Sequence, residues 1–278
     1  MHSTSKRSYL PLTFALFLFA VASFAKAEDL RIIAPYVGSL TDVYKDDSQG
    51  LDLKDSGLIT GLYFQWINTE RYQWNAFLYY APDVNYTKVL GGHFIFDYYL
   101  GPDWYGKFVL GAGLEAMHNK MDAGSNIEGL SVFDMDYTVW TPYLRAGKYF
   151  KAEVGPAELS FLPWAGIEPV WIRGDLSGTA PPYPPYMPTS TDFSESMDAY
   201  QLYSIAGANL RVMLFHFVDI EGKYQVTYGS WHAYSTVNAI ASVFFTRDMA
   251  FSYRYKYMQS LEGTGSDSYH FFGLAYLF

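Results

Sequence analysis

The chain has 278 residues, and its 19 lysine and arginine residues against 28 aspartate and glutamate residues give a formal net charge of −9. Nucleic acid attracts basic surfaces, so this acidic balance argues against a nucleic-acid partner. Cysteine is absent, which excludes disulfide bonds, thiolate metal ligands and cysteine nucleophiles.

The first 27 residues have the pattern of a secretory signal peptide. Lys6 and Arg7 precede an apolar run, Leu10–Phe24, and Ala25-Lys26-Ala27 fits a small-x-small cleavage site. This apolar run is shorter than the about twenty residues that a membrane-spanning helix needs. We therefore expect residues 1–27 to be removed and residues 28–278 to form one domain.

After residue 27 the chain consists of segments of about ten residues in which apolar and polar side chains alternate. In the clearest of them, Phe251–Met258, aromatic rings occupy every odd position while Arg254 and Lys256 lie between them. A period of two indicates β-strands, because successive side chains leave opposite faces of a strand. No stretch of eighteen consecutive apolar residues occurs here, which argues against membrane-spanning helices.

The number of segments with this alternation is even. A closed barrel needs an even number of strands if both chain ends lie on one side. The twelve predicted strands are Leu30–Gly38, Gly57–Asn68, Arg71–Ala81, Leu90–Leu100, Gly106–Met117, Asp136–Phe150, Glu158–Trp171, Ala199–Leu214, Phe217–Tyr228, Trp231–Phe245, Ala250–Gln259 and Ser268–Phe278. Two residues fit imperfectly: Lys148 lies on the apolar side of the sixth strand, and Pro163 interrupts the seventh.

The predicted connections differ in length by their order in the chain. Connections with even numbers are short, whereas those with odd numbers are longer, up to Ile172–Asp198 in the seventh, and only the ninth, Gly229-Ser230, is tight. Outer-membrane barrels have short periplasmic turns and longer outer loops. The lengths therefore favour such a barrel, with both termini in the periplasm, over a soluble β-sandwich or lipocalin-like barrel.

The last strand ends in Tyr276-Leu277-Phe278. This Tyr-x-Phe ending resembles the closing strand of bacterial outer-membrane β-barrel proteins. The resemblance implies a Gram-negative outer membrane as the location, outer-membrane lipid around the barrel, and recognition of Phe278 by the barrel assembly machinery. With the alternation, it leads us to expect an all-β fold, a single twelve-stranded antiparallel transmembrane β-barrel over residues 28–278.

If the aromatic face of each strand meets lipid, the opposite face lines the lumen. The predicted lumen residues are Arg31, Arg71, His93, Asp97, Lys107, Glu115, Arg145, Glu168, Arg211, Glu221, Lys223, Arg254 and Lys256. Both signs of charge occur among them. Such charges either pair with one another and close the lumen, or determine which solutes pass.

Two functions therefore remain open at the level of the sequence. The first is a narrow, porin-like channel for small solutes, since twelve strands lie between filled eight-stranded barrels and wide sixteen-stranded ones. The second is a closed structural or surface-exposed barrel whose lumen is occupied by its own ion pairs. Neither hypothesis requires a cofactor.

An outer-membrane hydrolase is a third and less favoured hypothesis. No histidine is followed two residues later by serine, the pattern of an outer-membrane phospholipase. Asp134-Met135-Asp136 has no Asp-x-His partner, which an outer-membrane aspartyl-type protease would show, so no catalytic residue is assigned. The aspartates around Asp42 lack the spacing of an EF-hand, and no metal site is predicted from them.

Overall fold

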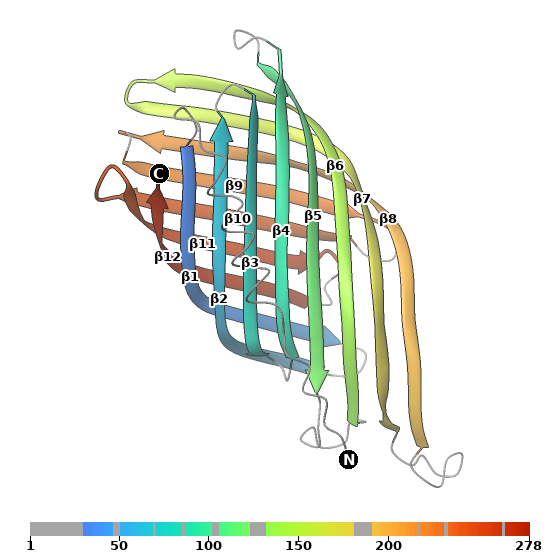
Figure 1. The fold of residues 1–278 in the computed structure, drawn as a ribbon. Helices are drawn as coiled ribbons and strands as arrows, with labels where there is room; N and C mark the ends of the chain where they lie inside the picture. The colour runs from blue at the N-terminus through green and yellow to red at the C-terminus, as the bar shows by residue number, and fades with distance from the viewer. Residues whose placement is uncertain are drawn as a thin grey trace, which may run out of the picture.

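The computed structural model describes residues 30–46, 51–68, 71–84, 87–101, 106–122, 132–180, 191–215, 217–230, 233–262 and 265–278. These residues form a closed barrel of antiparallel strands, in which each strand pairs with its neighbours in sequence and the first pairs with the last (Figure 1). The predicted signal peptide lies outside the described residues. Within the described ranges, no helix is long and apolar enough to cross a membrane.

The prediction of twelve strands in one antiparallel barrel is confirmed. The strands are β1 (Leu30–Asp46), β2 (Leu51–Asn68), β3 (Tyr72–Val84), β4 (Thr87–Leu100), β5 (Lys107–Asp122), β6 (Val132–Val154), β7 (Ala157–Ala180), β8 (Thr191–Leu214), β9 (Val218–Tyr228), β10 (Ala233–Phe244), β11 (Met249–Ser260) and β12 (Gly265–Leu277). Each of them overlaps one predicted segment.

The barrel has two distinct ends. Leu30 and Phe278 lie at one of them, where the Phe278 amide donates to the carbonyl of Arg31, and we call this the terminal end. The opposite end, which we call the loop end, has the two longest connections, residues 123–131 and 181–190. Glycines with positive φ occur in the terminal-end connections, at Gly101, Gly106 and Gly155, where a side chain would be strained.

The strands reach further toward the loop end than the sequence predicts. The predicted loop Ile172–Asp198 is largely a β-hairpin, in which β7 pairs with β8 out to Ala180 and Thr191. Likewise, β1 and β2 stay paired as far as Asp46 and Leu51. Beyond the membrane both faces of a hairpin contact water, so no alternation of hydrophobicity marks these residues as strand. The expected difference in length between odd-numbered and even-numbered connections is found only at the two longest connections, residues 123–131 and 181–190.

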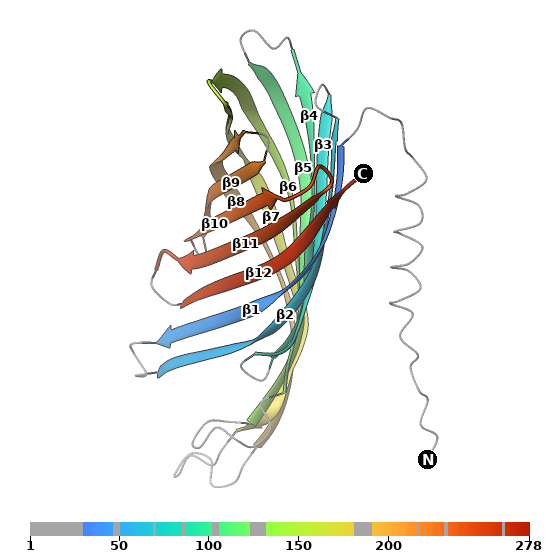
Figure 2. The same cartoon turned by 90° about the vertical axis from the view of Figure 1, so that its left-hand side faces the viewer.

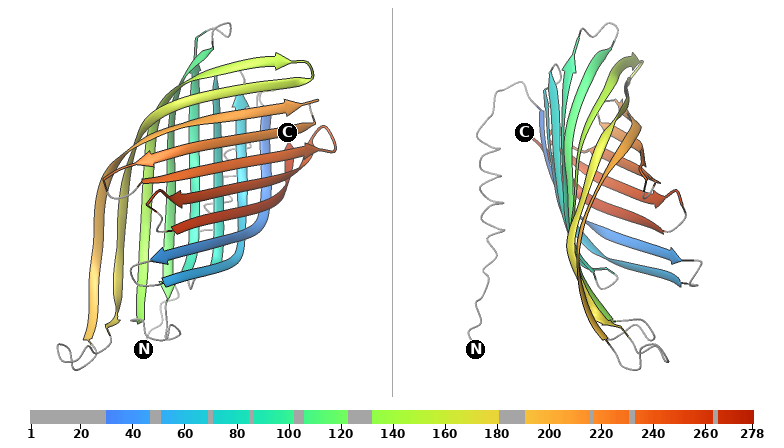
Figure 3. Two further views of the ribbon diagram at one scale, coloured as in Figure 1. Left: turned by 180° about the vertical axis from the view of Figure 1, so that it is seen from behind. Right: turned by 90° about the vertical axis from the view of Figure 1, so that its right-hand side faces the viewer.

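The strands on the two sides of the barrel run in different directions. In Figure 1, β3 to β6 stand upright and β9 to β12 cross behind them at a large angle, and the view from behind in Figure 3 shows the same crossing. The side view in Figure 2 shows β11 and β12 inclined away from β3 and β4. The walls formed by β3 to β6 and by β9 to β12 therefore face each other at an angle across the interior.

A belt of exposed apolar side chains surrounds the barrel. It includes Leu78, Phe94, Phe108, Leu110, Leu144, Ile167, Leu202, Leu210, Phe251, Phe272 and Leu274. On β11, Phe251 is 62% exposed on the outside, whereas Arg254 is 6% exposed and faces inward. An apolar outer belt around a polar interior is the arrangement of a barrel that crosses a membrane.

Lys148 and Pro163, the two residues that fit the predicted strands imperfectly, are both compatible with this barrel. Lys148 is exposed on the outside of β6, and its ammonium lies 5.4 Å from the ring centroid of Phe150, near the terminal end. A lysine there can direct its charge toward the membrane surface while its stem stays in the apolar belt. At Pro163, the β6–β7 ladder skips from Gly147–Trp164 to Phe150–Phe161, as a residue without an amide donor leads one to expect.

One side of the interior is filled by aromatic rings. The aromatic cluster comprises Tyr36, Tyr63, Phe77, Tyr79, Tyr269 and Phe271, from β1, β2, β3 and β12. Its rings contact one another across the interior, with centroids 5.0 Å apart for Phe77 and Phe271 and 5.8 Å apart for Tyr79 and Tyr269. This cluster narrows the lumen on the side of β1, β2, β3 and β12.

The apolar belt predicts how a charge at different depths affects stability. Leu144 and Val154 both face outward on β6, with exposures of 60% and 61%, but Leu144 lies in the middle of the belt and Val154 at the terminal-end turn. Leu144→Arg should lower the free energy of unfolding by about 2–4 kcal/mol, and Val154→Arg by about 0–1 kcal/mol. Urea unfolding of the barrel folded into lipid vesicles measures both; equal losses would contradict the placement of the belt.

Candidate functional site

The barrel interior contains a cavity of about 490 Å³, which we call the chamber. Inward-facing side chains from β2 to β12 line it, and many of them are tyrosines, amides or charged groups. Among the predicted lumen residues, those that line the chamber are His93, Asp97, Glu115, Arg145, Glu168, Glu221, Lys223, Arg254 and Lys256. Alternation along each strand thus brings residues far apart in sequence to one cavity.

The other predicted lumen residues lie nearer the terminal end. Arg211 faces inward on β8, where its guanidinium donates to both oxygens of Asp219, at 2.8 Å each. Lys107 is 8% exposed at the start of β5, on the same face as the inward Val109. Arg71 is exposed in the turn before β3.

The lumen prediction was wrong for Arg31. Its guanidinium carbon lies 4.5 Å from the ring centroid of Trp66 and 6.0 Å from that of Phe278, and both rings belong to the outer face. Ala34 and Tyr36 face inward, so the odd positions of β1 face outward. Arg31 lies at the edge of the apolar belt, where an aromatic girdle stabilises a cation that the middle of the belt would exclude.

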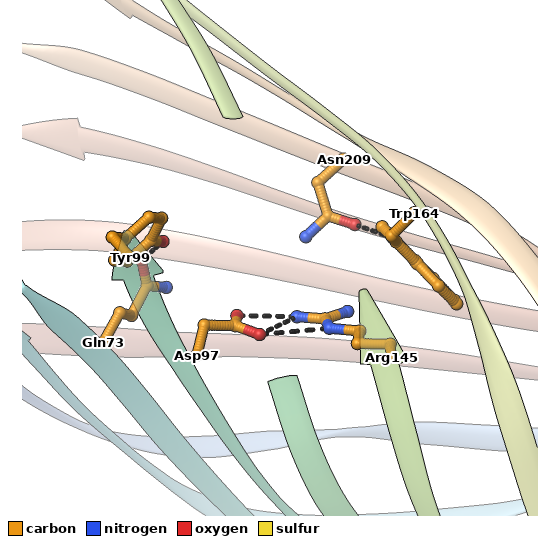
Figure 4. Close-up of polar contacts among 6 residues, drawn as sticks. All are labelled: Gln73, Asp97, Tyr99, Arg145, Trp164 and Asn209. Atoms are coloured by element: carbon orange, nitrogen blue, oxygen red, sulfur yellow. Dashed lines mark hydrogen bonds and ion pairs between the residues drawn. The ribbon is translucent and has the colours of Figure 1, made fainter. Parts of the chain in front are cut away.

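A buried ion pair bounds the chamber toward the terminal end (Figure 4). Arg145 on β6 donates to Asp97 on β4, with 2.6 Å between Nη2 and Oδ2 and 3.1 Å between Nε and Oδ1. Both side chains are almost fully buried, with exposures of 2% and 6%. The guanidinium also lies 5.0 Å from the ring of Trp164, whose indole N–H donates to Asn209. Bidentate pairing offsets the cost of burying both charges.

A second ion pair crosses the interior. Lys256 on β11 and Glu115 on β5 are 2.6 Å apart between Nζ and Oε1. In the ring of twelve strands, β5 and β11 stand six places apart, so this cross-barrel pair joins opposite walls. Beside it, the Nη2 of Arg254 lies 3.4 Å from the Nε2 of His93 on β4. The chamber is therefore spanned at this level by side chains from facing strands.

Two cations that line the chamber rest on aromatic rings. The guanidinium carbon of Arg254 is 4.3 Å from the ring centroid of Phe77, and the ammonium of Lys223 is 5.1 Å from that of Trp164. In the described part of the chain, neither cation has a carboxylate oxygen within 4.0 Å. Cation–π contact retains these charges inside the barrel without neutralising them.

Two carboxylates that line the chamber take no part in the ion pairs described above. Glu168 on β7 accepts a hydrogen bond from the hydroxyl of Tyr234 on β10, at 2.9 Å. Glu221 on β9 forms no salt bridge with any residue that the structure describes. The chamber wall thus presents both signs of charge.

A smaller pocket of about 330 Å³ opens at the loop end of β1, β10, β11 and β12. It shares Tyr234, Met258 and Asp267 with the chamber, so the two spaces adjoin. Asp267 stands opposite Asp42 in the β1–β12 ladder. On β12 the exposed apolar residues begin only at Phe272, which places this carboxylate pair beyond the apolar belt.

Within the carboxylate pair at the loop end, the surroundings of Asp267 raise its pKa. Burial, a hydrogen bond that the protonated Asp267 donates to Asp42, and the charge of Asp42 raise the pKa of Asp267 from its ordinary value of 3.8 to about 7, while Lys256 acts in the opposite direction. Two carboxylates this close cannot both ionise easily. The charge at this mouth of the barrel therefore changes near neutral pH.

The residues considered for hydrolysis lie on the outer surface. Asp134 and Asp136 are exposed on β6 near the loop end. His118 places the same nitrogen, Nδ1, 3.1 Å from Thr138 Oγ1 and 3.6 Å from Asp136 Oδ1. A nucleophile–base relay uses both ring nitrogens, one for each partner, so this geometry does not form one. Among the described residues, no group of three or more His, Asp or Glu side chains is placed to hold a metal ion.

Sequence reasoning concentrated on charged residues and passed over the inward tyrosines. Tyr63, Tyr79 and Tyr269 line the chamber from β2, β3 and β12, and Tyr203 and Tyr234 do so from β8 and β10. The parity of each strand was sufficient to place them inside. They were missed because an aromatic side chain in a barrel was assigned to lipid by default.

The structure resembles solved barrels of the bacterial outer membrane. The translocator domain of the autotransporter NalP from Neisseria meningitidis matches with a TM-score of 0.58 and 14% sequence identity, over 96% of this chain and 95% of that chain. The two chains share the fold of an antiparallel β-barrel. The KdgM porin (TM-score 0.43, 10% identity, 88% and 99% coverage) and the P. putida toluene transporter TodX (0.40, 9%, 93% and 92%) are more distant. No protein-family model and no curated protein matches the sequence.

The Asp97–Arg145 pair depends on a glycine between its two strands. A Cβ on Gly111 would collide with the Asp97 carboxylate and the Arg145 side chain, whereas a Cβ on Gly222 would meet nothing within 4 Å. Gly111→Ala should therefore destabilise the folded barrel by about 1–3 kcal/mol, the usual cost of overpacking, and Gly222→Ala should not. Urea unfolding in lipid vesicles compares the two; similar stabilities would show that the pair tolerates displacement.

The raised pKa of Asp267 predicts a pH-dependent opening of the β1–β12 ladder at the loop end. As the pH rises from 3.8 toward 7, the unfolded carboxyl ionises while the folded one keeps its proton, so the local stability falls. Hydrogen exchange of the amides around Asp42 and Asp267, corrected for intrinsic rates, should be faster at pH 8 than at pH 5. Asp267→Asn should abolish the difference; an unchanged difference would assign it to other groups.

Proposed function

We propose that this barrel is a narrow channel for small solutes in the outer membrane. The observation that carries the proposal is the chamber itself, a cavity of about 490 Å³ with polar and charged walls inside a barrel with an apolar outer belt. Twelve strands enclose more space than the eight of a barrel that its side chains fill, and the chamber is the part of that space that stays open. The volume falls within the range of about 300–1,000 Å³ of small-molecule sites.

The route that we propose begins at the loop end. The smaller pocket adjoins the chamber at Tyr234, Met258 and Asp267, and a solute would enter through it. The cross-barrel pair of Glu115 and Lys256 stands across the path, and the pair of Asp97 and Arg145 stands toward the terminal end. Selectivity would arise at these two levels, where charged side chains narrow the lumen.

A closed barrel is the second candidate function, and two observations favour it. The aromatic cluster fills the side of β1, β2, β3 and β12, and the cross-barrel pair joins the two walls that remain. In that case the charged interior would serve stability, and the surface at the loop end would carry the function. The two candidates differ in whether ions pass.

Conductance in planar lipid bilayers distinguishes the two candidates. The folded wild-type barrel should give small single-channel currents, and the double variant Glu115→Gln/Lys256→Met should give larger ones, because the cross-barrel pair is lost. The matched control is Glu158→Gln/Lys151→Met, which removes an exposed ion pair of 3.0 Å near the terminal end and should leave the current unchanged. If neither the wild type nor the first variant conducts, the channel is excluded and the closed barrel stands.

Two further expectations from the sequence stay predictions. We propose that residues 1–27 are removed on export and that the barrel assembly machinery recognises Phe278. In support of the second, the Phe278 ring faces outward, is 50% exposed and stacks on Tyr276 with centroids 6.0 Å apart. It is therefore accessible on the surface of the closing strand.

A further inference from the structure

Two opposite charges face the chamber at one level without meeting. Arg254 on β11 stands opposite Ile240 on β10, and Ile240 stands opposite Glu221 on β9. Arg254 and Glu221 are therefore two strands apart, about 9–10 Å between their backbones. Their side chains leave the same face of the sheet, and both line the chamber.

Neither charge has an ion-pair partner among the residues that the structure describes. Arg254 is 6% exposed, its Nη1 has no hydrogen-bond partner, and its nitrogens have no carboxylate oxygen within 4.0 Å in the described part of the chain. Ile240, which lies between the two charges, offers no polar atom. On the far side of Glu221, Arg211 is held by both oxygens of Asp219. Arg254 is buried and Glu221 is half-buried, and a charge inside the barrel without a counter-charge is costly, which favours a partner from outside the protein.

The other charges of the chamber leave this gap unfilled. Arg145 is paired with Asp97, Lys256 is paired with Glu115, and Glu168 accepts a hydrogen bond from Tyr234. Lys223, two residues from Glu221 on the same face of β9, rests on the ring of Trp164 and has no carboxylate oxygen within 4.0 Å in the described part of the chain. His93 lies 3.4 Å from Arg254, but a neutral imidazole accepts a hydrogen bond without neutralising the guanidinium. An ordinary anion would pair with Arg254 and leave Glu221 without a counter-charge. An ordinary cation would pair with Glu221 and leave Arg254 without one.

Building on the proposed channel function, we propose that the chamber binds a small zwitterion of the amino-acid class. Its carboxylate pairs with the guanidinium of Arg254, which reaches across the interior to Phe77, and its ammonium pairs with Glu221 on β9, so that the solute lies between the two charges. Ile95, Val139 and Ile240 line the chamber and offer apolar surface to a side chain. The solute thus supplies the two partners that the barrel lacks.

Three matched probes test the charge pattern. L-Phenylalanine carries both charges, 3-phenylpropanoate lacks the ammonium, and phenethylamine lacks the carboxylate. Isothermal titration of the folded full-length barrel in detergent at pH 7 should show L-phenylalanine binding at least roughly tenfold more tightly than either analogue, since each charged contact is worth more than one decade in affinity. Equal affinity for 3-phenylpropanoate would mean an anion site, and binding of none of the three would overturn the proposal.

Two substitutions assign the partners. Arg254→Met should remove the preference for L-phenylalanine over phenethylamine, and Glu221→Gln should remove its preference over 3-phenylpropanoate. Arg254→Lys keeps the charge and should keep most of the discrimination, which separates loss of a binding contact from loss of structure. Arg247→Met, at an exposed position in the turn before β11, is the control and should leave all three affinities unchanged.

The binding measurement and the conductance measurement test the two proposals separately, so that either proposal can fail without the other. A barrel that discriminates among the probes in detergent but gives no bilayer current would refute the channel and retain the zwitterion site. A barrel that conducts but binds the three probes equally would refute the site and retain the channel. If Arg254→Met and Glu221→Gln, verified as folded by far-UV circular dichroism, both leave the preference for L-phenylalanine intact, the two residues are not its partners.

Discussion

The structure depends on the pairing of β1 with β12, which closes the sheet. In hydrocarbon no water is present to satisfy backbone amides and carbonyls, so an open edge in the membrane would cost several kcal/mol for each unpaired group. The ladder runs from Ile32 and Leu277 to Tyr44 and Gly265, and the last amide, that of Phe278, also finds a partner. Closure fixes which face of every strand is inside, and all later features follow from that division.

The interior is not an empty tube because the inward face of this chain includes large rings as well as charges. The aromatic cluster occupies the side where β1 and β12 meet, and ion pairs tie the other walls together. What remains is a chamber with tyrosine and charged walls rather than a wide pore. The crossing of β9–β12 over β3–β6 brings these walls within reach of each other (Figure 3).

Much of the fold could be predicted from the sequence because lipid imposes a strict period of two. The number of strands, their order and the inward direction of residues such as Asp97 and Arg254 follow from that pattern. The ends of the strands could not be predicted: β7 and β8 continue as a hairpin in water, where neither face must be apolar. Arg31 was misassigned because the pattern alone does not show where the apolar belt ends.

The site was harder to predict than the fold. Parity placed Glu115 and Lys256 on the same side of the wall, but contact between β5 and β11 depends on the shape of the barrel cross-section, which no single strand encodes. The same is true of Arg254 and His93, which are separated by 161 positions in the chain. The gap between Arg254 and Glu221 emerges only from the register of three neighbouring strands.

In the channel that we propose, the bond between Glu115 and Lys256 makes movement past it an exchange reaction. Because the two side chains come from facing walls, whatever travels between them must first take over one of their charges, and the bond re-forms behind it. Dissolved salt competes for the same two charges and screens them. The resistance of the proposed channel to solutes then depends on the ionic strength of the medium, and it is not set by a fixed bore diameter.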